Sequence, residues 1–294
     1  MEWILFSILA AFTWAIVNIV DKYVLTKWIR KPIVPVMIIG IIGLIASIIV
    51  YYTHGFSELS YINILLAFVS GVFYILMSFF YFKAVKIEEI SRITPLFYLT
   101  PLFILILASI FLGEFFAPIK YLGIFLLVIG AFLISSKKIT KISFGKAFWL
   151  MILSSLFLAI NQVITKYLLG FADFWTIFSW TRIGTIVALI PVYFICFPDF
   201  ISTVKEHGKK VIGVVSLNES LNVVGVIFIT IAASVGYVTL VNALSSIQPL
   251  FVLIFAVFLS IFYPRILKEE MGKSTVLLKL VAIILMFAGA ILVS

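Results

Sequence analysis

The chain has 294 residues, of which 64% are hydrophobic and only 11% are charged, whereas soluble domains average about 45–50% and about 25%. A soluble monomer cannot hide so much apolar surface, because a chain of this size leaves roughly a quarter of its surface in contact with water. The composition therefore excludes a soluble enzyme, a nucleic-acid-binding domain and a disordered protein. The net charge of +9 must be interpreted by position, because basic residues of membrane proteins collect at the cytoplasmic ends of spans.

Ten apolar runs approach or reach the length of about 20 residues that a helix needs to cross the hydrocarbon core. They cover 3–21, 33–52, 61–82, 91–112, 119–136, 146–168, 174–197, 210–232, 239–262 and 275–294. The breaks between them are too short to hold a soluble domain. The N-terminus reads Met1-Glu2-Trp3, with an acid where a signal peptide carries basic residues, so we expect the first run to be retained as a span.

Eighteen of the 21 basic residues belong to the connections after the first, third, fifth, seventh and ninth runs. They are Lys22, Lys27, Arg30, Lys31, Lys83, Lys86, Arg92, Lys137, Lys138, Lys141, Lys146, Lys205, Lys209, Lys210, Arg265, Lys268, Lys273 and Lys279. The positive-inside rule therefore predicts that these connections are cytoplasmic and that both termini are extracytoplasmic. We expect a multi-pass protein of the cell membrane.

The two halves of the chain resemble each other in order. AIVNIVDKYVL (15–25) matches AINQVITKYLL (159–169), TPLFILILA (100–108) matches QPLFVLIFA (248–256), and GAFLIS (130–135) matches GAILVS (289–294). Each half holds five runs, an odd number, so the second copy must enter the membrane upside down. We therefore predict an all-α fold of ten transmembrane helices in two inverted repeats, 1–138 and 139–294. Such repeats are typical of secondary transporters.

One segment resembles a known family. The stretch TPLFYLTPLF…LGE (94–114), followed by YLGIFLLVIGAFLIS (121–135), looks like the EamA-like branch of the drug/metabolite transporter superfamily. The second half repeats these features more loosely as IQPLF (247–251), Glu270 and AGAILVS (288–294). The resemblance implies a ten-helix transporter fold, and relatives that move amino acids, drugs, nucleotide sugars, triose phosphates or lipid carriers.

The buried polar residues are the candidates for substrate contact, because an ionisable group inside a span costs at least about 2.5–3.5 kcal/mol. Asn218, Glu219 and Asn222 lie near the centre of the eighth run, and Glu219 is the leading candidate for binding a substrate and for coupling to protons. Arg182 in the seventh run could hold a carboxylate or phosphate, or it could neutralise Glu219. For Glu219 the structural alternative is a permanent ion pair.

Further polar residues lie on the first, fourth and sixth runs. Trp14 and Asn18 share one face of the first run, Gln162 aligns with Asn18 in the repeat, and Tyr98 lies on the fourth run. We predict that they line a cavity. The alternatives are hydrogen bonds between helices for Asn18 and Gln162, and ordinary aromatic packing for Trp14. Prolines inside a helix free a carbonyl and bend the helix, so Pro95, Pro101 and Pro249 are candidate hinges. A static kink is the alternative.

No phosphate-binding or dinucleotide motif occurs, and His54 and His207 lack metal-ligand spacing, so we expect no cofactor, no metal and no catalytic residue. The prediction is a secondary active transporter, an exporter or exchanger, that moves a small polar or amphipathic metabolite by alternating access. A flippase for a lipid-linked headgroup is the rival within transport, and a membrane enzyme or partner subunit is the rival outside it. The expected partners are the lipid bilayer and a small-molecule substrate, without nucleic acid, and the expected assembly is a monomer or weak dimer.

Overall fold

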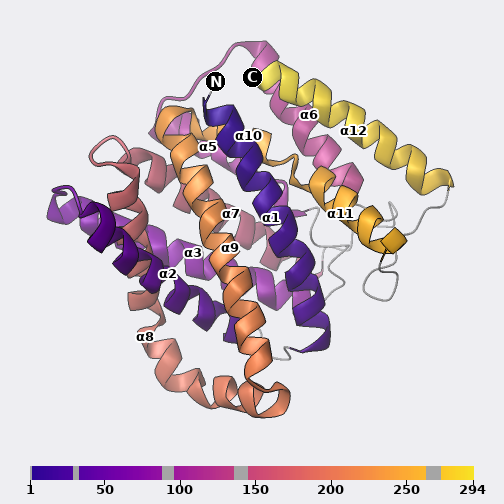
Figure 1. Ribbon diagram of the computed structural model, residues 1–294. Helices are drawn as coiled ribbons and strands as arrows, with labels where there is room; N and C mark the ends of the chain where they lie inside the picture. Colours follow the sequence, from indigo (N-terminus) through magenta and orange to yellow (C-terminus); the bar gives the residue numbers. More distant parts are fainter. Residues whose placement is uncertain (1, 29–32, 88–95, 136–144, 263–272) are drawn as a thin grey trace.

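The computed structural model describes residues 2–28, 33–87, 96–135, 145–262 and 273–294. Within these ranges the regular structure is helical and no strand occurs. Lipid offers no hydrogen-bond partner to backbone N–H and C=O groups, and a helix satisfies these groups within one segment. The helices are α1 (Glu2–Lys27), α2 (Ile33–His54), α3 (Tyr61–Ile87), α5 (Thr100–Phe111), α6 (Pro118–Ser135), α7 (Lys146–Leu168), α8 (Phe174–His207), α9 (Lys209–Val235), α10 (Val238–Ser245), α11 (Gln248–Phe262) and α12 (Lys273–Val293) (Figure 1).

Seven helical segments of the described ranges are long and apolar enough to cross a membrane. They are Glu2–Asp21, Ile33–His54, Tyr61–Ala84, Lys146–Leu168, Phe174–Glu206, Lys210–Val235 and Val238–Ser260. Three shorter apolar helices cover Thr100–Phe111, Pro118–Leu133 and Leu277–Val293. Each of the ten predicted runs overlaps one of these segments, and the expectation of an all-helical, multi-pass membrane protein is confirmed.

Two of the predicted runs are not continuous helices, which corrects the expectation for 91–112 and 239–262. A turn at residues 98–99 precedes α5, and a second turn at residues 246–247 separates α10 from α11. Pro101 and Pro249 are the second residues of α5 and α11, where a missing N–H costs little because the first N–H groups of a helix have no partner within it. These prolines therefore start new helices instead of bending long ones. Pro95 lies outside the described residues.

The main contacts between helices join α1 to α9, α3 to α7, α2 to α8 and α6 to α12, and the α6–α12 pair lies along one edge of the bundle in Figure 1. Glycines bring this last pair close together. A Cβ atom at Gly289 would lie 2.7 Å from the carbonyl oxygen of Gly123, and one at Gly130 would lie 2.9 Å from that of Ala282. Only a residue without a side chain fits at these positions.

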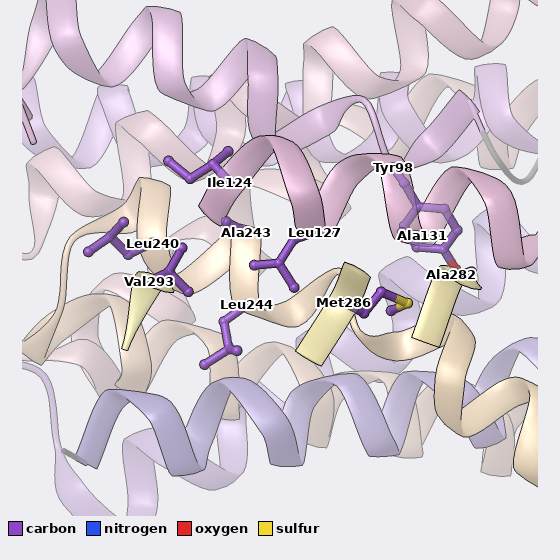
Figure 2. Close-up of a cluster of buried hydrophobic side chains, with 10 residues drawn as sticks. All are labelled: Tyr98, Ile124, Leu127, Ala131, Leu240, Ala243, Leu244, Ala282, Met286 and Val293. Carbon is purple, nitrogen blue, oxygen red and sulfur yellow. The ribbon is translucent and has the colours of Figure 1, made fainter. Parts of the chain in front are cut away.

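The α6–α12 pair contributes most of one apolar core cluster. Its ten buried side chains are Tyr98, Ile124, Leu127, Ala131, Leu240, Ala243, Leu244, Ala282, Met286 and Val293, and Figure 2 shows them between α6, α10 and α12. Ile124, Leu127 and Ala282 are fully buried. The cluster holds α10, whose other side reaches the cavity described below, against the pair.

One face of the molecule carries both chain ends (Figure 1) and is held by buried or half-buried charges. The Glu114 carboxylate accepts hydrogen bonds from the first N–H groups of α10, at 2.8 Å from Val238 and 3.0 Å from Thr239. The Lys166 ammonium donates to two carbonyls at the end of α9, both at 2.7 Å. Each charge therefore sits at the helix end whose dipole favours its sign, and together they fix the α9–α10 turn.

Candidate functional site

A cavity of about 190 Å³ lies between helices of both halves of the chain. Helices α1, α3, α7, α8, α9 and α10 all contribute to its wall, together with the turns that precede α5 and α11. Its polar or aromatic lining comprises Trp14, Asn18, Asp21, Tyr74, Ser78, Tyr81, Phe82, Phe97, Tyr98, Thr100, Asn161, Gln162, Thr165, Phe178, Thr181, Arg182, Glu219, Asn222, Thr230, Asn242, Ser245, Ser246 and Gln248. The cavity is thus lined by aromatic rings and amides, the mixture typical of small-molecule sites.

Two carboxyl groups face the cavity from neighbouring helices. Asp21 lies on α1 and accepts a hydrogen bond from the Asn218 side chain at 2.7 Å. Glu219 lies on α9, is only 3% exposed, and accepts one from Asn222 at 3.0 Å. The two carboxyl groups interact electrostatically. Because both partners are neutral amides, neither hydrogen bond cancels the charge of a carboxylate.

Arg182 brings a positive charge to the same cavity from α8. Its side chain is 2% exposed, and its Nε atom has no hydrogen-bond partner among the described residues. The guanidinium instead lies over the ring of Tyr74, 4.4 Å from the centroid, and 5.4 Å from that of Phe178. It interacts electrostatically with Glu219, but no ion pair within 4.0 Å joins these two described side chains. The permanent ion pair weighed as an alternative for Glu219 is therefore not formed.

Asn222 connects the acid to the aromatic wall. Its Oδ1 atom accepts a hydrogen bond from Trp14 Nε1 at 3.0 Å, and its Nδ2 atom donates to the Tyr74 hydroxyl at 3.1 Å as well as to Glu219. The absence of a side chain at Gly225 makes this possible, because a Cβ atom there would lie 2.6 Å from Trp14 Nε1. One amide thus ties together α1, α3 and α9, and it holds the Glu219 carboxylate in one orientation.

Seven of the eight residues predicted to contact a substrate line this cavity: Trp14, Asn18, Tyr98, Gln162, Arg182, Glu219 and Asn222. The eighth, Asn218, is buried behind the wall and holds Asp21. Most of the other lining residues were not predicted as site residues, and Asp21 and Thr181 are two of them. Asp21 stands three positions after Asn18 on the polar stripe of α1, and this spacing could have revealed it. The hydroxyl of Thr181 has no partner among the described residues, and nothing in the surrounding apolar sequence indicated that Thr181 is part of a site.

The donor set does not suggest a metal centre. In the part of the chain that the structure describes, no group of three or more His, Cys, Asp or Glu side chains lies close enough to hold an ion. The cavity offers hydroxyls, amides, aromatic faces and three charged groups. Such a wall can bind an organic molecule through charge and stacking.

Comparison with known proteins gives one family and one fold. Residues 1–136 match the model of the EamA-like transporter family, which confirms the resemblance to the drug/metabolite transporter superfamily. A crystal structure of a protein that is 16% identical has the same fold, with a TM-score of 0.73 over 99% of this chain and 95% of its own. No curated protein matches the sequence.

Proposed function

We propose that the chain, whose residues 1–136 match the model of the EamA-like transporter family, is a secondary active transporter. It moves a small polar or amphipathic metabolite by alternating access, as an exporter or exchanger, through the cavity between its two halves. The observation that carries the proposal is the placement of Glu219, Asp21 and Arg182 around one cavity in the middle of an apolar helix bundle. Ionisable groups inside membrane spans are expensive and mark transport pathways.

The packing of the helices supports two inverted repeats of five spans each. If α1, α2, α3 and α6 correspond to α7, α8, α9 and α12, exchange of the halves turns the α1–α9 contact into the α7–α3 contact. The α2–α8 and α6–α12 contacts each turn into themselves. These four pairs are the main contacts of the bundle, as a pseudo-twofold axis requires.

The two helix breaks support the same symmetry. The turn before α5 and the turn before α11 occupy matching positions, because Leu99 and Ile247 are equivalent in the repeat alignment. Both turns border the cavity through Tyr98 and Ser246. Transporters of this kind bind substrates where paired helices are broken near the midplane, and we propose that Pro101 and Pro249 mark the points about which α5 and α11 move.

The test is a thermal-shift screen of metabolites on the purified protein, followed by flux of each hit into proteoliposomes under an imposed pH gradient. We expect hits to stabilise the wild type, and flux to fall about 10-fold or more in Glu219→Gln, because one charge-assisted hydrogen bond is worth about 1.5–3 kcal/mol. Glu58→Gln, at an exposed acid of the α2–α3 connection, is the matched control and should behave as the wild type. Hits that bind but never cross the membrane would contradict the proposal.

A further inference from the structure

The described charges around the cavity do not balance. Asp21, Glu219 and Arg182 are the only Asp, Glu, Lys, Arg or His residues among the described side chains of its wall. With all three ionised, the described part of the wall carries one net negative charge. A net charge inside a membrane-spanning bundle is costly unless another group neutralises it.

In the part of the chain that the structure describes, the neighbouring residues do not supply the missing positive charge. Asp21 and Glu219 are each held by an asparagine amide, and Tyr74, Tyr81 and Tyr98 add phenol groups to the same wall. Lys166 on α7 is a further cation described on a helix that packs against α9. Its ammonium donates to Ala233 and Gly236 at the end of α9, and Lys166 is not part of the wall.

We propose that the cavity binds a small aromatic amine as its ammonium cation, in exchange for one proton held by the Asp21–Glu219 pair when the cavity is empty. An ammonium group has three donors, and the two carboxylates keep acceptor sites that the amides leave open. The proton leaves to water as the cation enters, so one positive charge replaces another. The inference rests on the proposed transport cavity.

The rest of the wall fits the apolar part of such a molecule. Trp14, Tyr74, Tyr81, Phe97 and Phe178 contribute aromatic rings to the same wall, and aromatic faces attract both a ring and a cation. The volume of about 190 Å³ suits one ring with a short chain, since a cavity of about 150 Å³ holds benzene. Arg182 already occupies the faces of Tyr74 and Phe178, so the ammonium is expected on the Asp21 side.

The test compares four probes that share a ring and a chain of similar length but differ in charge. They are phenethylamine (cation), 2-phenylethanol (neutral), phenylalanine (zwitterion) and 3-phenylpropionate (anion). Calorimetric titration of the purified wild-type protein in two buffers of different ionisation enthalpy gives the affinity and the number of protons released. We expect phenethylamine to bind about 10-fold or more tightly than the other three and to release about one proton. Equal or tighter binding of the neutral or anionic probe would overturn the inference.

Three variants separate charge from folding. Asp21→Asn and Glu219→Gln each make the wall neutral, so both should weaken phenethylamine about 10-fold and abolish proton release, while 2-phenylethanol binding is kept. Arg182→Gln leaves two negative charges and should keep or strengthen phenethylamine binding. If Arg182→Gln weakens the amine as the acid variants do, the three residues form a structural cluster and the inference is wrong.

Flux measurements keep this inference distinct from the proposed function. If proteoliposomes transport a neutral or anionic compound but not phenethylamine, the transport proposal is supported and the amine inference is contradicted. If phenethylamine binds with proton release but does not cross the membrane, the amine inference is supported and the transport proposal is contradicted. In the expected case, phenethylamine flux follows an imposed pH gradient and does not respond to an imposed membrane potential, because the exchange moves no net charge.

Discussion

Asp173, at the start of α8, shows how one loop carboxylate fixes a helix and a neighbouring connection. It accepts hydrogen bonds from the backbone N–H groups of Trp175 and Thr176, at 2.9 and 3.1 Å, and from the Thr176 hydroxyl. The Ser57 hydroxyl, in the connection after α2, donates to it as well. Partial burial alone would raise the pKa of Asp173, but these hydrogen bonds outweigh it and hold the pKa below its usual value.

This shift predicts an acid-sensitive contribution to stability. A carboxyl group with a lowered pKa in the folded state stabilises the fold above its unfolded pKa, about 3.9, and loses that effect as the pH falls through the folded value. The melting temperature of the wild type should therefore fall towards that of Asp173→Asn as the pH drops below about 4. Glu58→Gln should keep the wild-type profile. A constant gap between wild type and Asp173→Asn over this range would show that the charge is irrelevant.

Residue types predicted much of the site, because ionisable side chains inside a membrane span are costly and therefore rare. Glu219 and Arg182 were predicted as site residues for that reason alone. The side-chain partner of Asp21 was not predictable, since Asn218 and Asn222 are four positions apart and the sequence does not distinguish their roles. The bond of Asn222 to Glu219 lies within α9, at a spacing of three residues, whereas only the packing of α1 on α9 shows that Asn218 holds Asp21.

At the scale of elements, the contact of α3 with α8 depends on two glycines. A Cβ atom at Gly71 would lie 2.5 Å from the Thr181 carbonyl oxygen, and one at Gly184 would lie 2.5 Å from Phe68 Cα. Both obstacles are backbone atoms, so the helices would have to move apart. This movement would shift Thr181 and its neighbour Arg182 in the cavity wall.

We therefore predict that Gly71→Ala and Gly184→Ala each lower the free energy of unfolding by about 1–3 kcal/mol, the usual cost of overpacking. The matched control is Gly213→Ala, on an exposed position of α9 where a Cβ atom meets nothing within 4 Å. It should be neutral or stabilising by about 0.5–1 kcal/mol, because alanine favours helices. Thermal unfolding in detergent measures all three variants. Similar losses in all three would mean that the α3–α8 contact is not tight.

Hydrophobic runs located the helices well, because crossing lipid demands length and apolar side chains whatever the fold. They did not reveal the turns at 98–99 and 246–247, since the apolar composition continues through both. The prolines were noticed, yet their position after a turn, rather than inside a helix, depends on packing. At Leu96 the carbonyl oxygen accepts a hydrogen bond from the Ser155 hydroxyl on α7 at 3.2 Å, a contact between distant segments that helps to stabilise the break.

At the scale of the whole molecule, contacts place several connections on one face with both termini. Lys120, at the start of α6, donates to the carbonyls of Val293 and Ser294 at the C-terminus. Gly236, between α9 and α10, lies against Trp3 near the N-terminus. Ser57 joins the α2–α3 connection to Asp173 in the α7–α8 connection. The distribution of lysine and arginine predicts that this face is extracytoplasmic.

Labelling of single cysteines tests this orientation. The only native cysteine is Cys196, so Cys196→Ser provides the background for Glu58→Cys and Lys205→Cys, two exposed positions in the connection after α2 and near the end of α8. We expect a membrane-impermeant maleimide to label the Glu58→Cys protein in intact cells, and the Lys205→Cys protein only after permeabilisation. The reverse pattern would invert the molecule in the membrane. It would also reverse the direction in which a pH gradient drives the proposed amine exchange, while the cavity and its charge balance would stand.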